Sequence, residues 1–216
     1  MDQKYLIIND FLPEDFAEEL YTYIRTRTAE DWFYYYKYGK DEKPVLFDTS
    51  AEDTRKRKDL EPVLTDSLQS GEFTYTLKRL KKFWDVDMPT GRLRGDLRDP
   101  EFLQLLTEFS GIHNLELVED FCSIYDEGDF LSIHPDPNFD IAFILNLSKD
   151  WKYEYGGCLT VFDQERPTVI LPEFNSLVLM FLGDDGVDHY ISEVSSRAPD
   201  SRIAVSGWFN RKENSS

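Results

Sequence analysis

The spacing of apolar residues changes near Leu115. Before that point they recur at intervals of three and four, which is typical of one face of an α-helix. Three such stripes occur: Phe16, Leu20 and Ile24; Leu60, Val63, Leu64 and Leu68; and Phe102, Leu105, Leu106 and Phe109. Pro13 can begin the first helix, and Asp99 with Pro100 the third, which Gly111 can end. The pattern therefore predicts a helical flank over residues 1–110.

After Leu115 the stripes give way to short apolar or alternating segments separated by Gly, Pro, Asp and Asn. Segments of this length and composition predict β-strands. They are 121–125, 130–134, 141–147, 158–162, 168–171, 176–182, 189–194 and 202–209. Seven or eight strands joined by short turns predict a sandwich or barrel-like jelly roll over residues 115–210. We expect one domain over residues 1–216, with an α+β, mainly β fold and the helices on one side of the sheets.

Some stretches of the first half do not fit the three helical stripes. The aromatic run 32–36 predicts a strand on the sheet, with the lining of a substrate groove as the lesser alternative. The longest loop-like stretch is 38–54, and residues 38–58 are the candidate lid over a site. Two basic runs, 55–58 and 78–82, are interpreted as exposed helix faces, with contact to an acidic peptide as the alternative.

The composition supports a folded, acidic protein. Apolar residues make up 41% of the chain, and 42 acidic side chains outnumber 24 basic ones, a formal net charge of −18. Such a surface repels phosphate backbones and anionic lipid, so we expect no nucleic-acid or membrane partner. We find no signal peptide and no apolar run long enough to span a bilayer. Cys122 and Cys158 cannot form a disulfide framework, so we expect a cytoplasmic protein.

Candidate chemistry centres on the histidines, of which the chain has only three. His134 and Asp136 lie two residues apart at the end of a predicted strand, where side chains at i and i+2 point to the same face. His189 begins a later strand. Two imidazoles and one carboxylate on one side of a metal are typical of non-haem iron(II) oxygenases, which leaves coordination positions free for a co-substrate and oxygen. For His134 and Asp136 alone, an exposed turn is the simpler interpretation.

The last predicted strand adds a candidate anion site. Arg202, Ala204, Ser206 and Trp208 alternate onto one face of this strand. A guanidinium pointing into a jelly roll requires an anionic partner, because burial without one is costly. It can form a paired, charged contact with a carboxylate, to which the Ser206 hydroxyl can add a hydrogen bond. The far carboxylate of 2-oxoglutarate is the natural candidate.

Taken together, these motifs resemble the 2-oxoglutarate and iron(II)-dependent dioxygenases, in particular their prolyl-hydroxylase-like branch. The similarity is strong over about residues 115–210. The matching blocks are Tyr125-Asp-Glu-Gly-Asp-Phe-Leu-Ser-Ile-His134-Pro-Asp136, Leu145-Asn146 with Trp151, Gly156-Gly157-Cys158-Leu159, Pro172-x-x-Asn175, and Arg202-Ile-Ala-Val-Ser206-Gly-Trp208-Phe209. Because these blocks occur together and in order, the resemblance is specific.

The resemblance implies a double-stranded β-helix, with iron(II) bound by His134, Asp136 and His189. It also implies that Arg202 holds the far carboxylate of 2-oxoglutarate, helped by Ser206 and Tyr125. Oxygen is then the second co-substrate, and ascorbate a candidate reductant. The implied reaction is hydroxylation of a substrate C–H bond with release of succinate and CO₂. Retention of Asp136 favours hydroxylation over halogenation.

Several alternatives stay open. The substrate is expected to be a prolyl residue of a protein or peptide, but a free amino acid or another small molecule is the alternative. A different class of function is a cupin-like metal-binding module without turnover, and a third is a structural scaffold. Tyr125 has a second interpretation as core packing, and Trp208 is expected to be structural. Asn146 and Asn175 are expected to satisfy turn backbone, outside the site. The oligomeric state is not predicted.

Overall fold

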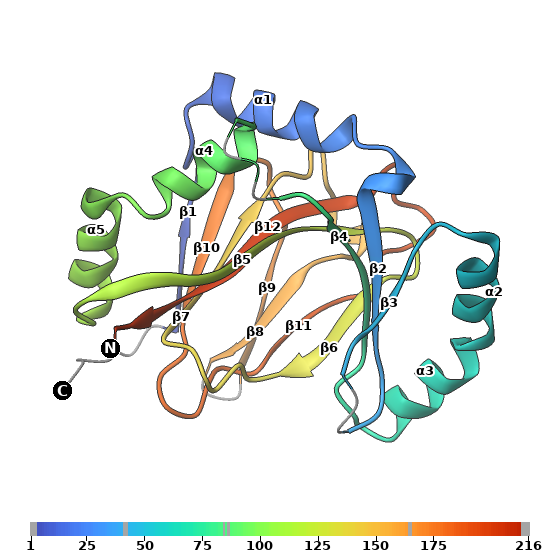
Figure 1. The fold of residues 1–216 in the computed structure, drawn as a ribbon. Helices are drawn as coiled ribbons and strands as arrows, with labels where there is room; N and C mark the ends of the chain where they lie inside the picture. The colour runs from blue at the N-terminus through green and yellow to red at the C-terminus, as the bar shows by residue number, and fades with distance from the viewer. Residues whose placement is uncertain (1–3, 41–42, 84, 86, 164–165, 213–216) are drawn as a thin grey trace.

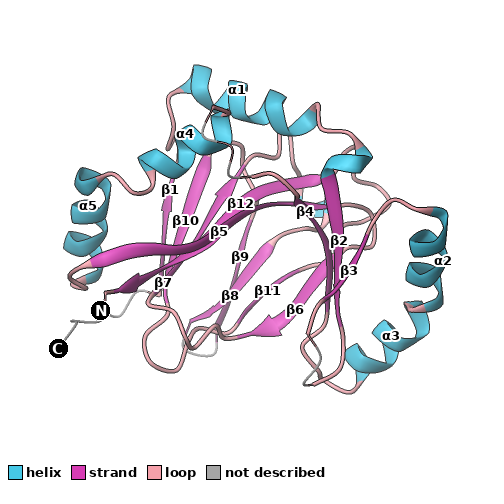
Figure 2. Ribbon diagram, viewed as in Figure 1, coloured by secondary structure: helices cyan, strands magenta, loops and turns pink. Residues whose placement is uncertain are grey.

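The computed structural model describes residues 4–40, 43–83, 85, 87–163 and 166–212. Within these residues the strands form one curled antiparallel sheet of twelve (Figure 1, Figure 2). Their order is β1-β10-β7-β12-β5-β4-β6-β11-β8-β9, and β2 pairs with both β3 and β4. The expected mainly β, jelly-roll fold is therefore confirmed.

The strands and helices have the following bounds. The strands are β1 Tyr5–Ile8, β2 Trp32–Lys37, β3 Val45–Phe47, β4 Tyr75–Leu80, β5 Leu115–Tyr125, β6 Phe130–His134, β7 Ile141–Asn146, β8 Leu159–Asp163, β9 Arg166–Ile170, β10 Ser176–Phe181, β11 His189–Ile191 and β12 Arg202–Arg211. The helices are α1 Glu14–Arg25, α2 Ala51–Asp59, α3 Glu61–Gln69, α4 Pro89–Asp96 and α5 Pro100–Ser110, with short 3₁₀ turns at Ala29–Asp31 and Tyr153–Tyr155.

Strand β4 joins the two halves of the curled sheet. One half is β1, β10, β7, β12 and β5, and the other is β6, β11, β8 and β9. Arg79 of β4 lies opposite Ser123 of β5, whereas Tyr75 of β4 lies opposite Leu131 of β6. In Figure 1, α1 and α4 lie along the top, α5 at the left, and α2 and α3 beside β2 and β3 at the right. The helices thus pack outside the curled sheet, and side chains of the strands line the space between its two halves.

Alternating side chains of the larger half build two separate cores. Along β7, Ile141, Phe143 and Leu145 belong to a cluster that includes the buried residues of α1. Ala142 and Ile144 point the other way and pack in a second cluster with residues of β8 and β11. The period-two pattern therefore places a helix-facing core on one side of the sheet and an enclosed interior on the other.

Local signals set the ends of α5 as the sequence predicts. The Asp99 carboxylate accepts a hydrogen bond from the amide of Glu101 at 2.8 Å, which caps the first turn. Gly111 ends the helix with φ +72°, a left-handed conformation that favours glycine. Helices α1 and α3 also form over the predicted stripes.

The prediction of a helical flank over residues 1–110 is only partly right, because β1, β3 and β4 also lie there, besides the predicted strand β2. The predicted strand at 32–36 is confirmed as β2. The run 78–82 does not form the predicted helix face: residues 78–80 belong to β4, which pairs with β2, β5 and β6. The loop-like stretch 38–54 contains β3 and the start of α2. Among the described residues, the helices are too short or too polar to cross a membrane.

Candidate metal and oxo-acid site

A cavity of about 180 Å³ lies between the two halves of the sheet. Its walls come from β4, β5, β6, β7, β10, β11 and β12. All six residues that the sequence analysis placed in the site line it: Tyr125, His134, Asp136, His189, Arg202 and Ser206. Residues distant in the chain are therefore brought to one enclosed space.

The three predicted metal ligands converge inside this cavity. The Nε2 atom of His134 lies 3.6 Å from Oδ1 of Asp136, and Nε2 of His189 lies 3.7 Å from Oδ2 of the same carboxylate. One donor atom from each residue fits within 4.8 Å of the other two. The strand register contributes directly, because His189 of β11 lies opposite His134 of β6. Such a cluster of two nitrogens and a carboxylate has the donor set of a facial-triad iron(II) site.

Backbone hydrogen bonds orient both imidazoles. Nδ1 of His134 lies 2.9 Å from the carbonyl oxygen of Ser132, and Nδ1 of His189 lies 2.7 Å from that of Val187. A proton on each Nδ1 satisfies these contacts and leaves each Nε2 lone pair directed at the shared centre. Phe73 stacks on the His134 ring with centroids 4.5 Å apart.

Burial keeps these imidazoles neutral. Desolvation lowers the pKa of His134, and desolvation together with the neighbouring His134 ring lowers the pKa of His189 to about 4. Near neutral pH both rings are therefore uncharged and can each donate a lone pair to a metal.

Asp136 reaches the site differently from the sequence prediction. Strand β6 ends at His134, and Asp136 adopts φ +53° in the turn that follows, instead of continuing the strand alternation. Aspartate tolerates this left-handed backbone better than most residues. The turn is held by the amide of Val187, which donates to the carbonyl of Pro135 at 2.9 Å. At Gly186, which has φ +76°, a Cβ atom would lie 2.0 Å from that carbonyl, so glycine is required.

Trp208 fixes the Asp136 carboxylate. Its indole Nε1 donates a hydrogen bond to Oδ2 of Asp136 at 2.9 Å, and Phe139 stacks on its ring at 4.7 Å. The expectation that Trp208 is only structural missed this contact. The alternation that placed Trp208 on the face of Arg202 was the available signal, but its partner lies 72 residues away in the sequence.

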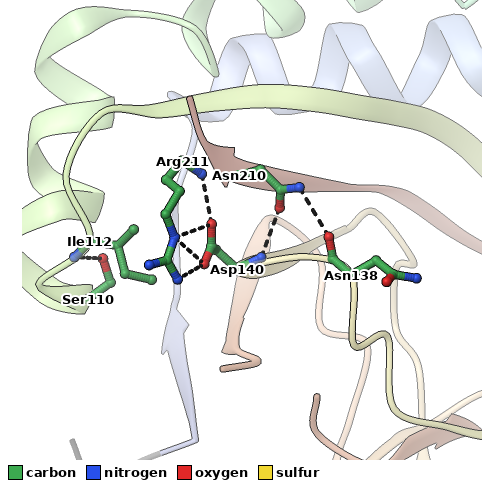
Figure 3. A network of polar contacts seen from close by, with 6 residues as sticks. All are labelled: Ser110, Ile112, Asn138, Asp140, Asn210 and Arg211. Carbon is green, nitrogen blue, oxygen red and sulfur yellow. Dashed lines mark hydrogen bonds and ion pairs between the residues drawn. The ribbon is translucent and has the colours of Figure 1, made fainter. Parts of the chain in front are cut away.

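A polar network holds the segment after Asp136 (Figure 3). The amide of Asp140 donates to Oδ1 of Asn210 at 2.9 Å, and Nδ2 of Asn210 donates to the carbonyl of Asn138 at 3.1 Å. The amide and Nε of Arg211 both donate to the Asp140 carboxylate, at 2.7 and 3.1 Å. Burial opposes ionisation of Asp140, but the bonds from Arg211 outweigh it and lower the pKa of Asp140. The turn that carries the central carboxylate is thus tied to the end of β12.

Arg202 is buried within the site, and no charged side chain of the described residues pairs with it. It is 1% exposed, and its Nε has no hydrogen-bond partner among the residues that the structure describes. Its Nη2 donates to Oδ1 of Asn146 at 3.3 Å, and its guanidinium lies 4.9 Å from the centre of the Tyr125 ring. Within the described part of the chain, the ionisable groups that act on it are the Tyr125 phenol and the Cys158 thiol, whose pKa values burial raises. A buried guanidinium with an unpaired donor fits an anionic ligand in the cavity.

Asn146 contacts Arg202, a contact that the sequence expectation of a turn-backbone role did not include. It lies opposite Ala204 of β12, and its Oδ1 accepts the hydrogen bond from Nη2 of Arg202. A single amide within the apolar run 141–147 was the signal that could have identified it. Asn175, in contrast, serves the backbone as expected: it accepts from the amide of Leu12 and donates to the Leu12 carbonyl, at 2.9 and 2.8 Å.

A family model for the 2OG-Fe(II) oxygenase superfamily matches residues 121–210. The matched segment contains the triad and Arg202. Residues 121–210 are therefore similar to the 2OG-Fe(II) oxygenase superfamily. That family uses Fe(II), 2-oxoglutarate and O₂, and the triad and the buried guanidinium of Arg202 in this chain fit such a metal and co-substrate.

Individual relatives agree with the family match. The chain is 33% identical to the prolyl 3,4-dihydroxylase OGFOD1 of Ostreococcus tauri, over 56% of this chain and 26% of the relative. It is also 33% identical to the prolyl 3-hydroxylase OGFOD1 of Mus musculus, over 50% of this chain and 21% of the relative. The chain therefore spans about a quarter of the length of these curated relatives.

A solved structure of a related fold covers nearly the whole chain. The crystal structure of a Pseudomonas putida prolyl-4-hydroxylase aligns with a TM-score of 0.61 and 16% identity, over 97% of this chain and 94% of that one. A Trichoplax adhaerens prolyl hydroxylase, solved with a peptide fragment of the hypoxia inducible factor oxygen degradation domain, aligns at a TM-score of 0.57 and 14% identity, over 96% and 83% of the two chains. These alignments extend the common fold to the N-terminal elements.

Proposed function

We propose that this chain is an iron(II)- and 2-oxoglutarate-dependent oxygenase that hydroxylates a prolyl residue of a protein or peptide. The observation that carries the proposal is the convergence of two neutral imidazoles and a carboxylate beside a buried, unpaired guanidinium in one cavity. With iron bound, the site would couple oxidative decarboxylation of 2-oxoglutarate by O₂ to hydroxylation of the substrate, releasing succinate and CO₂.

His134, Asp136 and His189 are proposed to hold the metal through Nε2, a carboxylate oxygen and Nε2, respectively. The carbonyls that bind each Nδ1 keep the rings in the tautomer needed for this role. The indole of Trp208 restrains the Asp136 carboxylate from the other side. These contacts keep the donor atoms oriented before the metal arrives.

Arg202 is proposed to bind the far carboxylate of 2-oxoglutarate. Asn146 orients the guanidinium from one side, and the Tyr125 ring lies beside it in the cavity wall. Ser206 lines the same cavity from the same face of β12 and is proposed as a further donor to that carboxylate. The enclosed position excludes bulk water, which strengthens a charged contact.

The prolyl substrate is proposed from the names of the relatives, which hydroxylate prolyl residues. A free amino acid or another small molecule is the alternative. The choice of a prolyl substrate therefore depends on relatives that align with this chain over about a quarter of their length.

The proposal is tested by measuring succinate formation from purified protein with Fe(II), 2-oxoglutarate and ascorbate as reductant, alone and with a cell lysate. We expect lysate-stimulated succinate, together with a protein or peptide that gains the mass of one oxygen atom on proline. The Asp136→Ala variant should abolish both signals while its folded circular dichroism spectrum remains. Wild-type activity in that variant would refute the site.

A further inference from the structure

Arg79 of β4 lines the same cavity but has no part in the metal or oxo-acid roles above. Its guanidinium lies over the Phe121 ring at 3.6 Å and near the Tyr35 ring at 4.8 Å. Two aromatic faces thus fix the direction of this side chain toward the cavity, so its donors are held in place before any ligand binds.

Arg79 lies at a more exposed part of the cavity wall than Arg202. Along the paired strands β5 and β12, Arg202 lies opposite Tyr125, whereas Phe121 and Glu119 lie progressively further along β5. Arg79 contacts these two latter residues. Exposure follows the same direction, since Arg202 is 1% exposed while the side chains of Arg79 and Glu119 are 21% and 52% exposed.

The charge of Arg79 is partly balanced, yet one of its donors is unused. Nη1 lies 3.6 Å from Oε1 of Glu119, so a carboxylate already accompanies the guanidinium. Its Nε is buried and, in the described part of the chain, has no hydrogen-bond partner. A donor of this kind suits a neutral acceptor, such as a peptide carbonyl, better than a second carboxylate, which Glu119 would repel.

Aromatic rings connect Arg79 to the metal site. Phe121 lies 5.7 Å from Trp208 by ring centroids, and Trp208 donates to Asp136. An apolar ring lying against these aromatic faces would therefore be next to the proposed metal. A polypeptide passing over them would bring one of its backbone carbonyls to Arg79.

We propose that Arg79 is a substrate-positioning residue that donates a hydrogen bond from its guanidinium to a backbone carbonyl of a polypeptide substrate. This assignment rests on the proposed function and selects between its two substrate classes. A free amino acid would bring its carboxylate to Arg79. That carboxylate would need a cation without a neighbouring acid, whereas Arg79 already has Glu119 beside it. The site thus favours a residue within a peptide chain over free proline.

The test measures equilibrium binding by calorimetry, without oxygen, to protein loaded with Fe(II) and 2-oxoglutarate. The probes are acetyl-Gly-Pro-Gly-amide and free L-proline. We expect the capped peptide to bind at least about tenfold more tightly than L-proline. Arg79→Leu should weaken the capped peptide by about 10- to 100-fold, the value of one charged hydrogen bond. Arg79→Lys should recover part of that loss. In both variants, Fe(II) and 2-oxoglutarate affinities should stay at wild-type values.

Arg27→Leu is the matched control, because Arg27 also lies over an aromatic ring, that of Tyr23 at 4.5 Å, but outside the cavity. It should bind both probes as the wild type does. A reciprocal variant, Glu119→Gln, changes an exposed carboxylate and releases the charge of Arg79, so it should strengthen L-proline binding.

Three outcomes would overturn the inference: equal or tighter binding of L-proline, no binding of either probe, or an Arg79→Leu protein that binds the capped peptide as tightly as the wild type. If Arg79→Leu does not fold, the Glu119→Gln variant provides the test. Unchanged L-proline affinity in Glu119→Gln would reject the substrate-positioning role of Arg79. Loss of Fe(II) or 2-oxoglutarate binding in the wild type would instead reject the proposed function, which keeps the two failures distinct.

Discussion

The two faces of strand β12 perform different tasks with alternating residues. The helix-facing side carries Ile203, Val205 and Phe209, all at most 1% exposed and all apolar. The cavity-facing side carries Arg202 and Trp208, whose polar groups meet Asn146 and Asp136 across the fold. The apolar side chains of the helix-facing side need no polar partner. On the cavity-facing side, the buried Nε of Arg202 has no hydrogen-bond partner among the described residues.

This contrast separates stability from ligand binding on a single strand. Apolar burial stabilises the fold in proportion to the area removed from water. A buried guanidinium without an anion costs free energy and is retained only where a ligand supplies the missing charge. Substitutions on the two faces should therefore change different measured quantities.

The largest expected effect is on the cavity face. Arg202→Leu should weaken 2-oxoglutarate binding by at least about 100-fold, because two or more charged hydrogen bonds disappear. The free energy of unfolding of the ligand-free protein should not fall, since an unpaired buried charge is also removed. Calorimetric titration of the co-substrate and urea unfolding check the two halves of this prediction, and a stability loss with unchanged binding would reverse the assignment.

Phe209→Ala tests the opposite face. Loss of a fully buried ring should lower the free energy of unfolding by about 3–5 kcal/mol through lost burial and a residual cavity. The folded fraction should bind 2-oxoglutarate as the wild type does, which titration at low temperature would measure. If binding weakens in the folded fraction as much as in the Arg202 variant, the two faces are not separable.

Trp208→Phe should have an intermediate effect. The ring remains for packing against Phe139, but the hydrogen bond to Asp136 is lost. Removing an outer partner of a metal ligand weakens metal affinity by about 10- to 100-fold. Competition with a metal chelator reports the Fe(II) affinity, and an unchanged value would make Trp208 a packing residue only.

The smallest effect is expected for Ile203→Val on the helix-facing side. One methylene is removed from a well-packed position, so unfolding free energy should fall by about 0.5–1.5 kcal/mol. Metal and 2-oxoglutarate affinities should not change. A measurable change in either would show that packing under the strand is coupled to the site.

The sequence predicted the second half of the fold better than the first. In strand β12, polar and small residues alternate with apolar ones such as Ile203 and Val205. This two-residue period was enough to assign each side chain to the correct face of the strand. Strand β4 is a counterexample. Its basic residues in 78–80 resemble an exposed helix face, and only pairing with β2, β5 and β6, distant in sequence, defines it as a strand.

The sequence singled out the three side chains that converge in the cavity, but not the residues that support them. His134, Asp136 and His189 have distinctive residue types and a recognisable spacing. The turn geometry of Asp136 was not predictable from strand periodicity, because the chain leaves the strand at His134. The partners Asn146 and Trp208 act through contacts between residues 56 and 72 positions apart, which no local pattern encodes.

We propose that one cavity holds both the metal and 2-oxoglutarate. The most direct test of this proposal is calorimetric titration of 2-oxoglutarate into the protein without oxygen, with and without Fe(II). We predict that Fe(II) strengthens 2-oxoglutarate binding by more than about tenfold, and that Asp136→Ala removes this strengthening while Arg202 is intact. Equal 2-oxoglutarate affinity with and without Fe(II) in the wild type would contradict a shared site.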